Sequence, residues 1–143
     1  MGLLEVARQL GVARGTVQAR LAKLEERGVV RSFGPEIDPQ RLGYPVLAFV
    51  FLQIAQGRLK EAVAVLDSTA EVLEATATSG PSDLLCRIVA QDTEHLQEIV
   101  NRLLSNNAIR RSTSYIALSQ PIAYRTGPLV ESAGAMLPAR GTR

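Results

Sequence analysis

The sequence has few of the residues from which most catalytic and metal sites are built. Among 143 residues there is one cysteine, Cys86, one histidine, His95, and no tryptophan. A single cysteine excludes an internal disulfide, as expected in a reducing compartment. Nucleophilic triads would have to use His95, and no Cys/His set has zinc-ligand spacing. We expect no enzyme, cofactor or metal site, with His95 a surface helix residue and Cys86 a small core residue.

Other signatures are also absent. The sequence has no GxxxxGK or GxGxxG segment, so the usual phosphate-binding loops are excluded. Its acidic residues form no evident pair for general acid–base work. No apolar run reaches the ~18 residues of a membrane span, and the N-terminus lacks the basic and apolar segments of a signal peptide. These absences predict a cytoplasmic protein.

Charge is distributed unevenly along the chain. The formal net charge is only +2, yet the stretch from Val6 to Lys23 holds four basic residues and no acidic one. The middle of the chain is mildly acidic. A local basic surface suits a polyanion such as DNA. On charge alone, a solvated helix face explains the same pattern equally well.

Apolar residues at helical spacing predict two short helices near the N-terminus. Gly11 separates them and Gly28 ends the second, while Ala13 is a weak N-cap. Two helices joined by a short turn with glycine form a helix-turn-helix unit. The first apolar stripe is Leu3, Val6, Ala7 and Leu10, and the second is Val17, Leu21 and Leu24.

Polar residues of the second predicted helix are the candidates for DNA contact. We place Arg14, Gln18 and Lys23 on the face opposite its apolar stripe, with Thr16 near the helix start. Such side chains reach phosphates or base edges. The full candidate set is Arg14, Thr16, Gln18, Arg20, Lys23 and, as a weaker member, Arg8.

The segments that follow predict a wing and a linker. Val29–Phe33 can form a short strand, and Phe33–Pro45 holds three prolines and two glycines that forbid a long regular element. We expect Ile37 and Leu42 to pack onto a neighbouring surface.

After Tyr44 the pattern changes to alternating strands and helices. Val46–Ala55 is apolar on both faces, and the Gly-Pro-Ser turn near residue 81 predicts a hairpin. The order is β-α-β-β-α-β, the ferredoxin-like plan. The predicted strands are Val46–Ala55, Glu71–Gly80, Asp83–Ala90 and Ser112–Ser119, and the predicted helices lie near Leu59–Leu66 and Leu96–Leu103.

This plan puts both helices on one face of the sheet and leaves the other bare. Because Val46–Ala55 is apolar on both faces, the bare face is an exposed patch of the kind that marks an interface. We therefore expect the chain to form a homo-oligomer, sheet against sheet. After Gln120 we predict packing from Pro121 to about Val130 and then disorder.

Four segments in this order resemble the Lrp/AsnC family of transcriptional regulators. LGVARGTVQARLAKLEERGVVR is similar to the family's recognition helix and its exit, and IDPQRLGYPV to its linker. GPSD matches its G-x-x-D turn, and SYIALSQPI its last strand. The resemblance spans about residues 3–126. It implies an α+β fold, a winged helix-turn-helix followed by a ferredoxin-like domain that senses a small molecule, usually an amino acid, and assembles into dimers or octamers.

The resemblance also defines the expected domains and an alternative. They are a helix-turn-helix over 1–32, a linker over 33–45, a ligand-binding and oligomerisation domain over 46–126 and a flexible tail over 127–143. The helix that precedes this pair in the family has no counterpart here, which leaves open a start further upstream or an incomplete DNA-binding unit. The leading hypothesis is a DNA-binding regulator that senses an amino acid; the alternative is a DNA-independent amino-acid-binding sensor or regulatory subunit.

The predicted hairpin turn is the candidate effector site. A tight turn exposes backbone N–H groups that can grip a carboxylate, and Asp83 could meet an ammonium. The same residue types also suit a hairpin for conformational reasons alone. The candidates are Thr76, Thr78, Ser79, Gly80, Pro81, Ser82 and Asp83, with Thr113 and Ser114 from the last strand.

Overall fold

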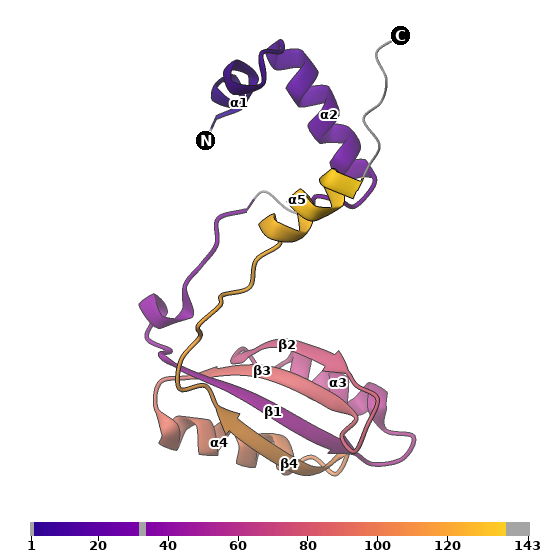
Figure 1. The fold of residues 1–143 in the computed structure, drawn as a ribbon. Coiled ribbons are helices and arrows are strands. Elements are labelled where there is room, and N and C mark those ends of the chain that lie inside the picture. Colours follow the sequence, from indigo (N-terminus) through magenta and orange to yellow (C-terminus); the bar gives the residue numbers. More distant parts are fainter. Residues whose placement is uncertain (1, 32–33, 137–143) are drawn as a thin grey trace. The chain divides into compact units, whose positions relative to one another are not determined.

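A computed structural model describes residues 2–31 and 34–136, which divide into two compact units (Figure 1). The N-terminal unit, Met1–Asp38, holds α1 (Leu3–Leu10) and α2 (Arg14–Glu26). The C-terminal unit, Pro39–Arg143, holds the short 3-10 helix η1 (Pro39–Leu42), β1 (Val46–Ile54), α3 (Leu59–Asp67), β2 (Val72–Ala77), β3 (Leu84–Ala90), α4 (Thr93–Leu104), β4 (Ile109–Ile116) and α5 (Gly127–Met136). None of the helices in the described ranges is long and apolar enough to cross a membrane.

The two predicted N-terminal helices and their glycine turn are confirmed. Gly11 ends α1 with φ +63°, a left-handed conformation that glycine adopts without strain. Ala13 starts α2 without a side-chain hydrogen bond, as its weak capping ability predicts. Ala7 and Val17 are buried between the helices, whereas Leu10 is 62% exposed.

The strand predicted over Val29–Phe33 is wrong for residues 29–31, which have no strand structure. The N–H groups of Val29 and Val30 both donate to the Leu24 carbonyl oxygen, at 2.9 and 3.2 Å. These bonds turn the chain back against the end of α2, so it does not extend here. The rest of the predicted strand, residues 32–33, lies outside the described residues.

The linker contains the short helix η1, and its apolar residues do not pack as expected. Ile37 and Leu42 are each 66% exposed. Gly43 N–H donates to the Gln40 carbonyl oxygen at 3.1 Å, and Tyr44 N–H to that of Pro39 at 3.0 Å. The linker end is therefore held by its own backbone rather than by those two side chains.

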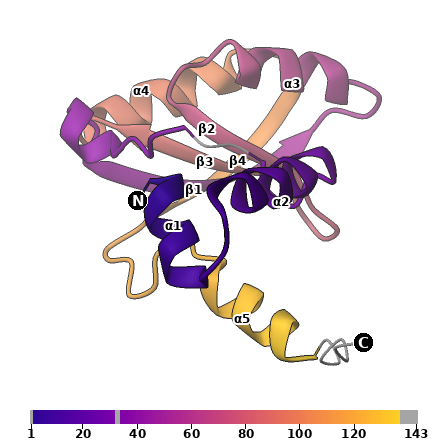
Figure 2. The same ribbon diagram turned by 90° about the horizontal axis from the view of Figure 1, so that it is seen from above.

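The C-terminal unit has the predicted ferredoxin-like plan. Its four strands form one antiparallel sheet in the order β2-β3-β1-β4. Helices α3 and α4 lie together on one face of that sheet (Figure 2). The core between these layers includes Val50 and Leu52 of β1, Ile88 of β3 and Ile99 of α4.

Cys86 lies in that core, as predicted. Its side chain is fully buried in β3, and burial raises the pKa of the thiol to about 11. A thiol is nucleophilic only as the thiolate. Cys86 therefore acts as a small apolar residue at neutral pH.

The last strand, β4, begins three residues before the predicted Ser112–Ser119. A register shift at Gln53/Ile54 pairs Ile54 with Ile109, which is buried at the start of the strand. Arg110 and Arg111 interrupt the apolar pattern, so the sequence alone did not indicate that the strand begins at Ile109. Leu118 lies beyond the end of the strand and is 96% exposed.

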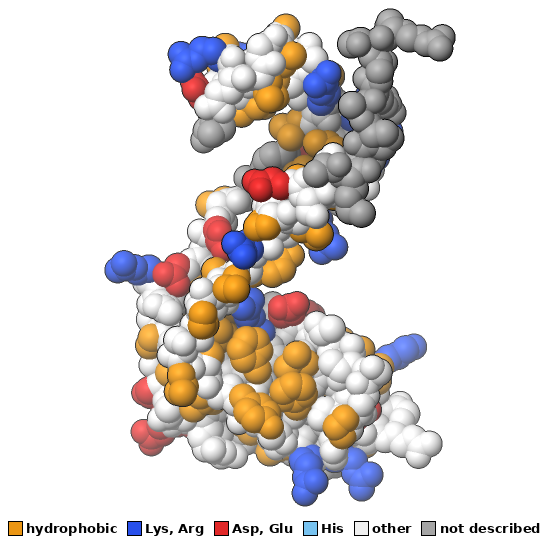
Figure 3. Space-filling model, in the orientation of Figure 1, with side chains coloured by type: hydrophobic (Ala, Val, Ile, Leu, Met, Phe, Trp, Pro, Cys, Tyr) orange, Lys and Arg blue, Asp and Glu red, His pale blue; other side chains and the backbone are white. Residues whose placement is uncertain are grey.

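The other face of the sheet carries large apolar side chains that remain partly exposed. Leu47, Phe49 and Phe51 alternate with the buried residues of β1, and Tyr115 of β4 is 60% exposed. The rings of Phe51 and Tyr115 meet edge to face with centroids 5.8 Å apart. Figure 3 shows hydrophobic side chains gathered over the sheet. We call this surface the open sheet face.

The tail differs from its prediction in two ways. Residues 121–130, which we expected to pack, are exposed, and residues 127–136 form α5. Pro128 lies in the first helical turn, where its missing N–H costs nothing. The prolines and glycines of the tail therefore led us to predict no helix where α5 forms. Residues 137–143, which we predicted to be disordered, lie outside the described residues.

Candidate nucleic-acid interface and effector site

Helix α2 carries the candidate DNA-contact side chains in two rows rather than on one face. At about 100° per residue, Arg14 and Gln18 fall on one side of the buried stripe, and Thr16, Arg20 and Lys23 on the other. The face directly opposite the stripe holds Gly15, Ala19, Ala22 and Glu26, so the expected single face of candidate DNA contacts was wrong. All five polar candidates are exposed.

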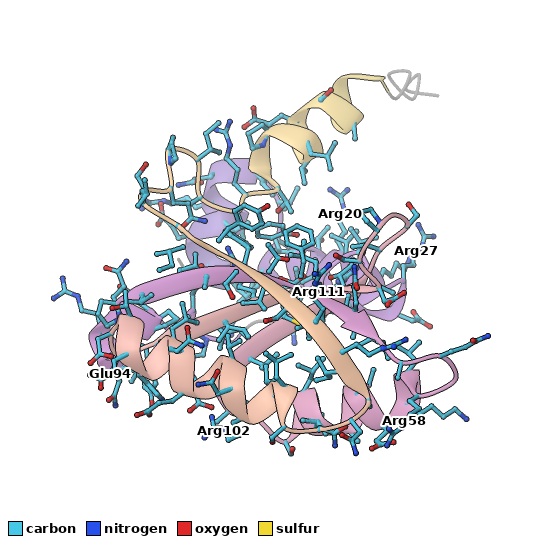
Figure 4. The ribbon with its side chains drawn as sticks, turned by 90° about the horizontal axis from the view of Figure 1, so that it is seen from below. Arg20, Arg27, Arg58, Glu94, Arg102 and Arg111 are labelled. Atoms are coloured by element: carbon cyan, nitrogen blue, oxygen red, sulfur yellow. The ribbon has the colours of Figure 1, made fainter. Side chains whose placement is uncertain are left out.

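Sequence reasoning missed the last member of one row. Arg27, the C-cap of α2, lies seven residues after Arg20 and is exposed. Arg20 and Arg27 are labelled in Figure 4. The i, i+4, i+7, i+11 spacing makes Thr16, Arg20, Lys23 and Arg27 a continuous stripe, which we call the basic stripe. Searching seven residues beyond Arg20 would have found it.

Arg8, the weaker DNA candidate, lies on α1 in a local ion pair. Its Nη2 is 3.0 Å from Glu5 Oε1, and both side chains are well exposed. An exposed pair of this kind stabilises a protein by at most about 1 kcal/mol. It can therefore be exchanged for a phosphate contact at little cost.

The predicted effector turn is a closed loop between β2 and β3. Thr78 N–H donates to the Asp83 carbonyl oxygen at 3.0 Å, and the Thr78 hydroxyl donates to the Ser82 carbonyl oxygen at 2.7 Å. Gly80 has φ +142°, a conformation open to glycine. Within residues 2–31 and 34–136, the N–H groups of Ser79, Gly80 and Ser82 meet no hydrogen-bond acceptor.

Asp83 ties this loop to the middle of the sheet. Its Oδ2 accepts a hydrogen bond from Ile54 N–H at 2.7 Å, and its own N–H donates to the Leu52 carbonyl oxygen at 2.9 Å. The carboxylate thus has a structural function that the sequence did not reveal. Gln53 was also missed: its side-chain amide donates to the Pro81 carbonyl oxygen at 3.1 Å. As the one polar residue in an apolar strand, Gln53 was detectable.

The remaining effector candidates do not gather at this loop. Thr76, Leu85, Phe51 and Thr113 occupy one row across the open sheet face, with the two threonines on opposite edge strands. Three strand spacings of about 4.8 Å separate those edges by roughly 14 Å. Ser114 follows Thr113 in the strand and faces the other side of the sheet. Within one chain, therefore, the side chains of Thr76, Thr113 and Ser114 do not form a single site.

His95 is not the simple surface residue we predicted. Its side chain is 20% exposed, its Nδ1 accepts from Gln91 N–H at 3.2 Å, and its Nε2 lies 3.4 Å from Glu71 Oε1. Arg102 Nη2 lies 3.1 Å from the same Glu71 oxygen. Arg102 stands near the end of α4, well away from Glu94 at its start (Figure 4). No group of His, Cys, Asp and Glu among the described residues could hold a metal.

The pKa of Glu71 reflects opposing influences. Burial alone would raise it, but a hydrogen bond from its own backbone N–H, the Arg102 hydrogen bond and the charges of Arg102 and His95 lower it below its usual value. A carboxylate whose pKa is lowered by folding stabilises the fold above its unfolded pKa. That stability is lost as pH falls through the folded pKa.

Glu71→Gln is therefore expected to cost stability at pH 7 and progressively less as the pH falls below about 4. Chemical unfolding of both proteins across this range measures the difference in the free energy of unfolding. Glu98→Gln, which changes an exposed carboxylate on α4, is the control. If Glu71→Gln lowered the free energy of unfolding by the same amount at every pH, that result would contradict the lowered pKa of Glu71.

Comparisons with known proteins match both units. Residues 3–31 fit a family model described as winged helix-turn-helix DNA-binding, and residues 47–126 fit the Lrp/AsnC ligand binding domain. The HTH-type transcriptional regulator FL11 of Pyrococcus horikoshii is 30% identical over 116 residues, covering 81% of this chain and 77% of that protein.

Solved structures agree with this assignment. An AsnC family transcriptional regulator from Agrobacterium tumefaciens has a TM-score of 0.80 and 27% identity, covering 96% of this chain and 89% of that one. A feast or famine regulatory protein from M. tuberculosis, complexed with L-methionine, has a TM-score of 0.78 and 26% identity, covering 87% and 84%.

A helix-turn-helix unit joined to a ferredoxin-like ligand-binding domain defines a DNA-binding transcriptional regulator. The chain belongs to the Lrp/AsnC family. This family consists of transcriptional regulators.

Proposed function

We propose that the protein binds double-stranded DNA through α2 and changes that binding when an amino acid occupies the effector site. The observation that best supports DNA binding is the basic stripe, which places three cationic side chains and one hydroxyl on one side of an exposed helix. Arg20, Lys23 and Arg27 suit phosphate contacts, which fix position. Arg14, Thr16 and Gln18 lie near the helix start and suit base edges. Arg8 adds a weaker phosphate contact.

Arg20→Ala tests the phosphate contacts. Each contact with B-DNA contributes about 0.9 to the slope of log K against log salt. The variant is expected to bind all duplexes more weakly and to lower that slope by about one. Fluorescence anisotropy at several salt concentrations measures the slope, with Arg58→Ala, at the N-cap of α3, as the control. An unchanged slope removes Arg20 from the phosphate set.

The effector site we propose is the loop of residues 78–83. Its N–H groups at Ser79, Gly80 and Ser82 can bind a carboxylate. Asp83 Oδ2 is used by Ile54 N–H, and its second oxygen can accept from an ammonium. Carboxylate and ammonium together are the shared part of every free amino acid. The relative solved with L-methionine supports this ligand class.

Asp83→Asn separates ligand binding from the fold. An amide keeps an oxygen acceptor for Ile54 N–H but removes the charge that attracts an ammonium, so the fold is expected to persist while the response to amino acids is lost. Asp83→Ala instead leaves that N–H without its acceptor and is expected to cost about 1–3 kcal/mol. Thermal shift with a panel of L-amino acids measures both. A full ligand response in Asp83→Asn would contradict the assignment.

Assembly is the third part of the proposal. The open sheet face, with Phe49, Phe51 and Tyr115, suits a homodimer that pairs sheet against sheet. Thr76 and Thr113, at opposite edges of this face, then come near residues of a second protomer, where they can line an effector cleft; Ser114 is the weakest candidate. We place this DNA-binding oligomer in the cytoplasm.

A further inference from the structure

The end of the linker is held on the C-terminal unit by a set of contacts that the regulator function does not require. Residues Pro39–Tyr44 close into a turn through two backbone hydrogen bonds, from Gly43 to Gln40 and from Tyr44 to Pro39. Gly43 has φ +92°, which only glycine adopts readily. This turn sets the position of Tyr44, two residues before the start of β1.

Tyr44 then meets α4. Its ring and that of His95 have centroids 6.2 Å apart at an interplanar angle of 45°. Both side chains line one cavity of about 410 Å³, together with Glu71 and residues from the first turns of α4. Tilted aromatic pairs at this separation are favourable contacts.

His95 is itself held in orientation from two sides. Because Nδ1 accepts from Gln91 N–H, the neutral ring carries its hydrogen on Nε2, which faces Glu71. Glu71 is held in turn by Arg102, 31 residues away in sequence. The four side chains Tyr44, His95, Glu71 and Arg102 therefore connect the linker to α4 and to the start of β2. We call them the linker anchor.

We infer that the linker anchor fixes the point at which the chain toward the DNA-binding helices leaves the effector domain. Tyr44 is the contact, while His95, Glu71 and Arg102 are positioning residues that hold it. A fixed exit point reduces the ordering cost of placing two helix-turn-helix units on one duplex. This consequence rests on the proposed dimeric function, but the anchor itself does not.

Limited trypsin digestion of the full chain tests the anchor directly. Arg41 is exposed within η1, so cleavage after it reports opening of the linker end. Tyr44→Ala and His95→Ala are each expected to speed this cleavage by roughly twofold to tenfold, the value of one aromatic contact. Tyr44→Phe keeps the ring and is expected to cleave at the wild-type rate. Glu61→Ala, which breaks an exposed ion pair with Arg58 on α3, is the matched control.

Cleavage after Arg87, within β3, serves as the internal measure of unfolding. A variant that only destabilises the domain speeds both cuts equally, whereas loss of the anchor speeds the Arg41 cut alone. Equal cleavage at Arg41 in wild type and Tyr44→Ala would overturn the inference, as would an effect of Tyr44→Ala that His95→Ala does not share.

The consequence for DNA is tested on a duplex selected by the wild-type chain from a random library, and on its half-length version. Tyr44→Ala is expected to weaken binding to the full duplex severalfold and to leave the half-length duplex unchanged. Equal weakening on both would overturn the coupling to paired units. Wild-type failure to bind any duplex would instead count against the proposed function, while the trypsin result would stand.

Discussion

Phe51→Asp is expected to prevent the sheet-to-sheet dimer that we propose, leaving monomers. Phe51 lies at the centre of the open sheet face, in contact with Tyr115. In one chain it is half-buried, so a carboxylate there stays hydrated and the fold persists. In a sheet-to-sheet dimer the same carboxylate would be buried without a partner, which costs several kcal/mol.

Sedimentation equilibrium at micromolar concentration measures this change in mass. A cost of about 4 kcal/mol raises the dimer Kd roughly a thousandfold, enough to dissociate a submicromolar dimer. Leu118→Asp is the matched control, because Leu118 is a fully exposed apolar residue just beyond β4 and its substitution is expected to leave the mass unchanged. An unaltered mass for Phe51→Asp would show that the open sheet face is not the interface.

Replacing all three arginine and lysine residues of the basic stripe is expected to abolish measurable DNA binding near physiological salt. With Arg20, Lys23 and Arg27 changed to alanine, the salt slope falls by about 2.7, and affinity at 0.1 M salt falls roughly 500-fold. The three side chains are exposed, so the substitutions remove no packing. Alanine also favours the helix.

The measurement is anisotropy on a labelled duplex, with thermal unfolding to verify the fold. A matched variant neutralises three basic residues away from α2, with Lys60, Arg110 and Arg111 changed to alanine; all three are exposed. If both triple variants lose affinity equally, net charge rather than the basic stripe explains the binding.

The sequence predicted those elements whose signals are local. The apolar stripes and Gly11 gave both N-terminal helices, and the two-sided apolar pattern gave β1. The open sheet face followed because a ferredoxin-like order places both helices on one side. The hairpin loop was predicted correctly because consecutive residues of it, such as Gly80, Pro81 and Ser82, are types that favour turns.

Errors arose where backbone geometry or strand pairing differed from what the residue types indicated. The N–H groups of Val29 and Val30 donate to the Leu24 carbonyl oxygen, so no strand forms there. Pro128 is compatible with the first turn of a helix, so α5 forms despite it. The register shift beside Ile54 advanced the start of β4. The first two errors came from local backbone geometry that residue type alone did not predict, and only the third came from a contact between distant segments.

The candidate site was predictable only in part for the same reason. Asp83 was selected as a ligand contact, but its bond to Ile54 N–H joins residues 29 apart and has no periodic signature. The Glu71–Arg102 pair spans 31 residues and was equally invisible. Arg27, by contrast, continued a spacing already present in the sequence.

The most direct measurement is fluorescence anisotropy of the full chain on labelled DNA from its own upstream region, with salt titrated and L-amino acids added. We predict tight binding that exceeds binding to a random duplex, a steep salt slope, and an affinity that changes with at least one amino acid. The contradicting result is no selective binding from a chain that still elutes as a folded oligomer and binds amino acids; it would establish the DNA-independent sensor.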